Sequence, residues 1–256
     1  MLLRNDMELK RKYGLSFYEL ETAPENSGEA YTIARELVEN LFFLMSKLST
    51  KLCDTQQYEF CLLPYTFTER RLDSVLLPAL SKLCDSLVLT ELPANRKTKD
   101  KTYIGRIDYW CIYKGYSFII ELKQSYDNAN TDNTRREEIL DQWNTMIQQL
   151  NSVKTEASKY EEKTNGVIRL GLHMITSYNP ETPSPEIING YNKRKIESIA
   201  NRLYYHIGKK TPLRKPDLFI CWRIPSYIVE QDGDCSYLGL WTIAKIYSPV
   251  QHKGLR

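Results

Sequence analysis

The chain has 256 residues, of which 42% are hydrophobic and 26% charged, and its formal net charge is +3. These proportions are typical of a globular protein and argue against a disordered chain. No apolar run approaches the roughly 18 residues of a membrane span, and the first residues lack the apolar core of a secretory signal. The six cysteines show no zinc-ligand spacing. We therefore expect one domain, residues 1–256, in the reducing cytoplasm and not in a membrane.

Apolar periodicity and turn residues predict the elements of the chain. In chain order these are a helix over 29–52, a helix from a Thr66–Glu69 capping box to about 83 that Pro78 kinks or divides, a strand near 87–92, a basic loop over 96–106, a strand hairpin around Lys114-Gly115, a polar connection over 128–134, a helix over 135–153, a strand over 167–176, a loop over 179–185, a basic helix over about 190–207, and strands over 218–224 and 238–247. This order predicts an α/β (mixed α+β) fold with a central mixed β-sheet flanked by helices on both faces. Residues 1–65 are expected to form a helical extension on a core of about 66–250.

Two apolar strands flank the Lys114-Gly115 turn, and their register brings charged residues together. A two-residue loop places Asp108 directly opposite Glu121, with Lys123 on the face of Glu121. A four-residue loop keeps this register, whereas a three-residue loop shifts it by one. Opposed side chains have Cβ atoms about 4.5–5.5 Å apart, and like charges there are unfavourable. We therefore expect a divalent cation between the two carboxylates, with the lysine alongside.

The Glu-x-Lys pattern occurs three times, beginning at Glu8, Glu121 and Glu161. The copies at 8 and 161 are typical of solvated charge, whereas the copy at 121 ends an apolar run and has an acid across the hairpin. Apolar residues on both faces of these strands indicate a strand pair that is covered on both sides. One alternative stays open, in which Asp108, Glu121 and Lys123 are only a surface ion-pair cluster of a structural protein.

Basic side chains gather in two segments of the chain. Residues 96–106 carry five basic and one acidic side chain, and residues 189–216 carry eight basic and one acidic. Two such segments on a near-neutral chain favour a polyanion-binding face, although lysines also solvate ordinary loops. The candidate nucleic-acid-binding residues are Arg96, Lys97, Lys99, Lys101, Arg106, Lys193, Arg194, Lys195, Lys209 and Lys210.

A helix bearing Glu69, then a strand, then Asp108-x12-Glu121-x-Lys123 on a hairpin, resembles the PD-(D/E)XK nuclease superfamily, whose fold is restriction-endonuclease-like. The resemblance covers about residues 66–180. It implies that Asp108, Glu121 and the carbonyl of Leu122 bind Mg²⁺ or Mn²⁺ and that Lys123 positions the attacking water. Catalytic roles are also implied for Glu69, with Asp73 as the second candidate for the helix acid, and for Gln124. Ile107 stands where the motif has its proline.

The resemblance therefore implies a metal-dependent deoxyribonuclease, acting in defence against foreign DNA or in repair. DNA is the expected partner, and a homodimer is possible because related enzymes that cut both strands often pair. The alternative function is a catalytically inactive nucleic-acid- or protein-binding module on the same scaffold. The sequence contains no P-loop, no dinucleotide-binding glycine motif and no serine-hydrolase elbow.

Overall fold

The structure is a computed structural model that describes most of the chain in ten segments. They comprise residues 2–3, 15–19, 28–55, 64–66, 69–97, 101–130, 136–153, 164–210, 215–229 and 235–247. The strands are β1 (Leu2–Leu3), β2 (Leu15–Glu19), β3 (Leu89–Lys97), β4 (Thr102–Tyr113), β5 (Tyr116–Asn128), β6 (Val167–Asn179), β7 (Leu218–Arg223) and β8 (Ser236–Tyr247). The helices are α2 (Glu29–Thr55), η1 (Pro64–Thr66), α3 (Glu69–Leu83), α4 (Arg136–Ser152), α5 (Pro185–Gly190), α6 (Lys193–Lys210) and α7 (Ser226–Val229).

Strands β3 to β8 form a mixed sheet, and the short strands β1 and β2 extend it beyond β7. Across the described residues the strand order is β1-β2-β7-β8-β6-β5-β4-β3, and β5–β6 is the single parallel pair. A parallel pair needs a crossover connection, and α4 lies in the one between β5 and β6. The predicted mixed sheet is therefore confirmed.

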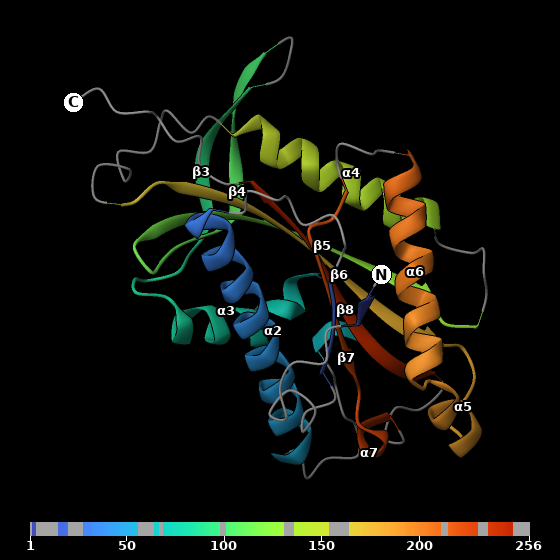
Figure 1. The fold of residues 1–256 in the computed structure, drawn as a ribbon. Helices are drawn as coiled ribbons and strands as arrows, with labels where there is room; N and C mark the ends of the chain where they lie inside the picture. Colours follow the sequence, from blue (N-terminus) through green and yellow to red (C-terminus); the bar gives the residue numbers. More distant parts are fainter. Residues whose placement is uncertain are drawn as a thin grey trace.

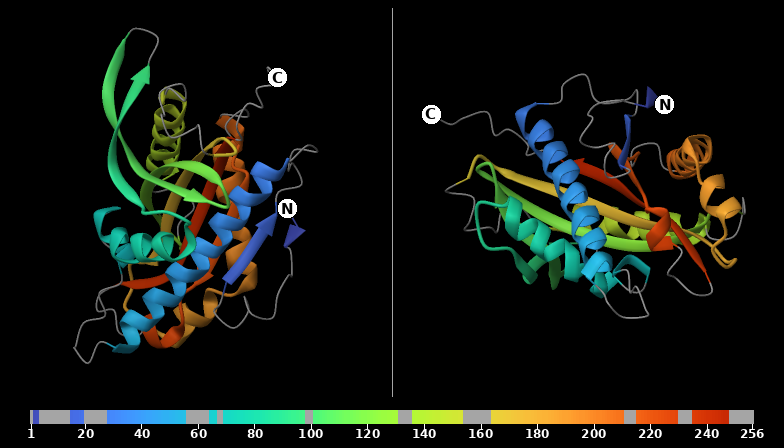
Figure 2. Two further views of the ribbon diagram at one scale, coloured as in Figure 1. Left: turned by 90° about the vertical axis from the view of Figure 1, so that its left-hand side faces the viewer. Right: turned by 90° about the horizontal axis from the view of Figure 1, so that it is seen from below.

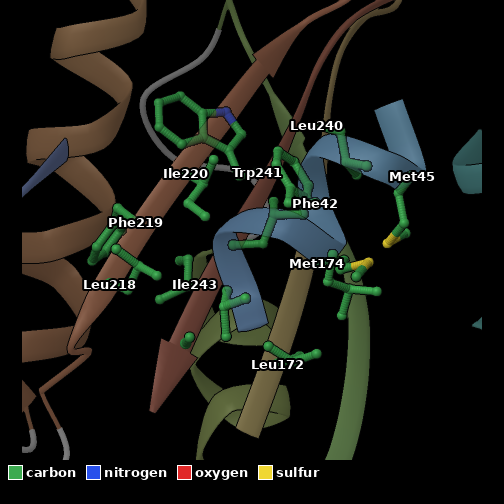
Figure 3. Close-up of a cluster of buried hydrophobic side chains, with 14 of the residues drawn as sticks. Phe42, Met45, Leu172, Met174, Leu218, Phe219, Ile220, Leu240, Trp241 and Ile243 are labelled. Carbon is green, nitrogen blue, oxygen red and sulfur yellow. The ribbon is translucent and has the colours of Figure 1, made fainter. Parts of the chain in front are cut away.

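Helices cover both faces of this sheet (Figure 1): α2 and α3 lie on one face, and α4 and α6 on the other. Alternation along the strands explains why both faces are apolar. On the α2 face, Phe42 and Met45 gather with Leu172 and Met174 of β6 (Figure 3). On the α4 face, a Cβ added to Gly171 would lie 2.7 Å from a Met146 side-chain atom, so α4 packs directly on β6. No helix in the described segments combines the length and apolarity of a membrane span.

Three details of the predicted elements are wrong. The segment 96–106, expected as a loop, belongs mostly to β3 and β4, because exposed polar residues there alternate along two paired strands. The N-terminal part contains β1 and β2 as well as a helix, and β2 pairs with β7. Helix α3 runs from Glu69 to Leu83 with Pro78 inside it, so Pro78 does not divide the helix, and Thr66 lies in η1.

Candidate functional site

The β4–β5 hairpin has the predicted two-residue turn. Lys114 and Gly115 have φ angles of 48° and 74°, and two positive φ angles are the mark of the type I′ turn that suits a tight hairpin. The ladder runs from Tyr113↔Tyr116 to Tyr109↔Ile120, so the next residues in register are Asp108 and Glu121. The predicted register is confirmed up to Tyr109↔Ile120, and the predicted Asp108–Glu121 pair lies one step beyond the end of the ladder.

Strands β4 and β5 separate just beyond that last pair, and Asp108 lies at the fork. Past Tyr109 the ladder of β4 continues with β3 alone. The backbone N–H of Leu122 donates to Oδ2 of Asp108 over 2.7 Å, so a side-chain carboxylate replaces the strand carbonyl that would accept this bond within a ladder. The fork therefore fixes the side chain of Asp108 against the edge of β5.

Glu121 lies beside the fork with its side chain fully buried, at 0% exposure. Its Oε1 accepts a hydrogen bond from Nη2 of Arg96 over 2.5 Å, and the two residues form a buried ion pair. Its Oε2 is buried without a hydrogen-bond partner. A buried carboxylate oxygen without a partner is costly and needs a physical explanation.

Arg96 is held in place from three sides. Its Nη1 donates to the carbonyl of Gln149 over 2.8 Å and to Oγ of Ser152 over 3.2 Å, both near the end of α4. Its Nη2 also donates to the carbonyl of Arg106 on β4. A Cβ at Gly105 would lie 2.5 Å from Arg96 side-chain atoms, so a glycine there gives the guanidinium its path inward. Arg96 is 3% exposed and belongs to the interior, not to the basic surface on which the sequence placed it.

Lys123 and Glu69 lie on the open side of the fork. Nζ of Lys123 donates to the carbonyl of Leu122 over 2.9 Å and lies 3.9 Å from Oε1 of Glu69. Asp73, the second candidate for the helix acid, accepts instead from the hydroxyl of Tyr109. Glu69 is therefore the acid of α3 that reaches the lysine.

Gln124 points elsewhere. Its Nε2 donates to the carbonyl of Tyr65 over 2.9 Å, and Oγ1 of Thr176 donates to the same carbonyl over 2.8 Å. The amide of Gln124 therefore anchors η1 to the sheet. The structure brings together Asp108, Glu121, Lys123 and Glu69, but it directs the Gln124 amide away from them.

The acidic side chains of the site share raised pKa values, chiefly because of burial. Burial and then the charge of Asp108 raise the pKa of Glu121 to about 7, against the opposing effect of Arg96. Burial also raises the pKa of Asp108, while the Leu122 N–H and Lys123 lower it. The pKa of Glu69 is raised by burial as well. Additional positive charge at this site would favour the ionised forms of all three.

Sequence reasoning missed two residues near this site. Glu91 precedes the β3–β4 pair Leu92↔Ile107, has a φ of 53°, and its charge helps to raise the pKa of Asp108 and of Glu69. A positive φ is uncommon for a residue other than glycine, and no sequence pattern marks it. The role of Arg96 was hidden because a basic run shows charge but not which side chain turns inward.

The other basic candidates occupy separate places. Lys97, Lys101 and Arg106 are exposed on β3 and β4 or next to them, whereas Lys99 lies outside the described residues. At the start of α6, Lys193 and Arg194 are exposed and Lys195 is half-buried; the side chains of Lys209 and Lys210 lie outside the description. Tyr204 of α6 contacts Phe219 of β7, so α6 covers the far part of the sheet from β3. The described basic residues of the two segments therefore lie over different parts of the sheet.

The donors at the fork are those that Mg²⁺ prefers: carboxylate and carbonyl oxygens. Oε2 of Glu121 lacks a partner, and Asp108 is next in register across the fork. The carbonyl of Leu122 bonds to Lys123, and a carbonyl oxygen keeps a second lone pair. Within the described segments, no three His, Cys, Asp or Glu residues are grouped closely enough to hold a metal by themselves. The residues fit a site with two carboxylates, the number Mg²⁺ commonly takes from a protein.

Comparison of the whole chain with protein-family models and with curated protein sequences finds no match.

Proposed function

We propose that this chain is a Mg²⁺-dependent nuclease, on a restriction-endonuclease-like scaffold, that hydrolyses phosphodiester bonds of DNA in defence against foreign DNA or in repair. The observation that carries the proposal is the fork: Asp108 and Glu121 one step beyond the last ladder pair, one buried oxygen of Glu121 without a partner, and the ammonium of Lys123 beside them. Three charged groups of these types, partly withdrawn from water, suit phosphoryl chemistry better than solvated surface charge.

Each residue then has a role set by its position. Asp108 and Glu121 would hold Mg²⁺, which polarises a phosphoryl oxygen and lowers the pKa of bound water. Lys123 is tethered by the Leu122 carbonyl and places its positive charge where a water attacks phosphorus. Glu69, 3.9 Å from that ammonium, orients it. Arg96 fixes Oε1 of Glu121 and so directs Oε2 as the free ligand oxygen.

A direct test is cleavage of plasmid DNA with Mg²⁺ or Mn²⁺. Asp108→Asn and Lys123→Ala should each reduce the rate at least 100-fold, since each removes one part of the charge arrangement. Lys114→Ala and Asp141→Asn are matched controls, because both residues are exposed and lie away from the fork. Unchanged cleavage by both fork variants would rule the nuclease out.

The second candidate is an inactive nucleic-acid-binding or protein-binding module, and Arg96 favours it. The guanidinium already neutralises Glu121, so the site tolerates a buried carboxylate without a metal. Calorimetric titration of the protein with Mn²⁺ separates the two candidates. Binding that Asp108→Asn abolishes supports the nuclease, whereas no binding by the wild-type protein, together with no cleavage, supports the inactive module.

A further inference from the structure

Strands β3 and β4 extend beyond the rest of the sheet as a two-stranded ribbon, residues 92–97 and 101–107 (Figure 2, left). The paired residues of a ribbon share a face, and successive pairs alternate between faces. The inner face consists of Leu92 with Ile107, Ala94 with Gly105, and Arg96 with Tyr103; the outer face consists of Pro93 with Arg106, Asn95 with Ile104, and Lys97 with Thr102.

The inner face is fixed to the body of the protein. Leu92 and Ala94 pack on a small core cluster that includes Trp110 and Val153, and Arg96 is bonded to α4. This attachment covers the inner face from Leu92 to Arg96, whereas Tyr103 near the tip is 40% exposed.

The outer face is exposed at all six positions, and Ile104 is 78% exposed. A single exposed isoleucine is ordinary on a protein surface, and here it places one apolar side chain on a basic face. Lys97 and Arg106 share this face, and the exposed Lys101 at the tip of the ribbon has its Nζ 5.6 Å from the ring of Tyr103 on the inner face. The exposed charges on described residues 92–97 and 101–107 are therefore all positive, which opposes a second copy of the ribbon and attracts phosphates.

The outer face also leads to the fork. Asp108 follows Arg106 by two residues on β4, and both Asp108 and Glu91 of β3 lie between the pairs Thr90↔Tyr109 and Leu92↔Ile107. Nη1 of Arg106 lies 3.0 Å from Oε2 of Glu91, whose charge helps to raise the pKa of Asp108. A molecule that contacts Arg106 on the outer face therefore reaches the neighbourhood of Glu91 and Asp108.

We propose that the outer face of the ribbon binds double-stranded DNA, with the ribbon in the major groove and Lys97, Lys101 and Arg106 against the phosphates. A major groove about 12 Å wide admits a two-stranded ribbon, and Ile104 would meet base edges or thymine methyl groups there. The inference rests on the proposed function and names the segment that holds its substrate. The backbone strand flanking the groove then passes Asp108.

Fluorescence anisotropy of a labelled DNA duplex, titrated in EDTA at several salt concentrations, tests this without any cleavage. The double variant Lys97→Gln/Lys101→Gln should bind about tenfold more weakly and lower the salt slope by nearly two. Ile104→Ser should bind several-fold more weakly with the slope unchanged. The double variant Lys47→Gln/Lys82→Gln, on exposed positions of α2 and α3, is the control for charge and should bind as wild type.

Four outcomes would overturn the ribbon proposal. The first is unchanged binding by the ribbon variants, and the second is loss of binding only when Lys193 and Lys195 of α6 are replaced. The third is tighter binding to a single strand than to the duplex. The fourth is a dimer of the wild-type protein that Ile104→Ser dissociates without weakening DNA binding. If the protein never cleaves DNA but the ribbon variants lose duplex binding, the nuclease proposal is wrong and the ribbon proposal stands. If cleavage depends on Asp108 but the ribbon variants bind DNA normally, the nuclease proposal stands and the ribbon proposal is wrong.

Discussion

At the scale of single residues, the buried pair of Arg96 and Glu121 has the largest expected energetic effect in the site. Removing both charges from water is unfavourable, and the pair is tolerated because the guanidinium has acceptors on α4, β4 and β5. Either partner alone would be an unpaired buried charge. The pair therefore fixes the base of the ribbon and the orientation of Glu121 together.

Arg96→Ala should lower the free energy of unfolding by about 3–5 kcal/mol, because it leaves Glu121 buried without its counter-charge. Arg106→Ala removes an arginine from the same ribbon and should cost less than about 1 kcal/mol, since its ion pair with Glu91 is exposed. Urea denaturation followed by circular dichroism measures both. Equal effects of the two substitutions would contradict the burial argument.

The same pair offers a second check by combination. Replacing both partners, Arg96→Met with Glu121→Leu, should recover most of the stability lost by Arg96→Ala, because no buried charge remains. A double variant as unstable as the single one would mean that Arg96 acts through packing and its bonds to α4 and not through Glu121.

At the scale of elements, the hairpin was predictable because its information is local. Lys114-Gly115 between two apolar runs specifies the turn, and a tight turn sets every pair up to Tyr109↔Ile120. The ribbon was not predictable in the same way, because the lysines, threonines and glycine of segment 96–106 are typical of a loop. Its strand pairing becomes favourable only when the inner face meets α4 and Arg96 finds its partners.

Gly115→Ala should destabilise the protein by about 1–2 kcal/mol, because Gly115 has a φ of 74° that an L-residue adopts at a cost. The added Cβ would also lie 3.0 Å from Nδ2 of Asn165. Gly190→Ala is the matched control, since nothing lies within 4 Å of the Cβ it adds. Thermal unfolding monitored by circular dichroism compares them, and equal midpoints would show that the turn does not need its glycine.

At the scale of the whole molecule, the sheet is covered on both faces and therefore buries polar groups between layers. His173 of β6 is the clearest case. It is 0% exposed, its Nε2 lies 2.8 Å from Oγ of Ser125, and its ring stacks on Trp143 with centroids 6.4 Å apart. Burial, and then the charge of Lys123, lower the pKa of His173 to about 3.

The protein should lose stability in acid through this histidine. In the unfolded chain His173 takes up a proton near its ordinary pKa of about 6.5, whereas the folded protein resists protonation down to about pH 3. Between these values the unfolded state binds more protons than the folded state. The free energy of unfolding therefore falls by up to about 1.4 kcal/mol for each unit by which the pH is lowered. Urea midpoints of wild type and His173→Gln between pH 7 and 5 measure this. Parallel profiles for the two proteins would contradict it.

The sequence alone determined the strand hairpin, its register as far as Tyr109↔Ile120, and most of the helices and strands, because turn chemistry and apolar periodicity act over a few residues. Only the tertiary structure decided which basic residue turns inward, where β4 separates from β5, and that the Gln124 amide bonds to η1. Those features depend on α4, η1 and the ribbon meeting across long stretches of chain. Burial then raises the pKa values of the carboxyl groups at the fork, and no local sequence pattern predicts that these charged residues are buried.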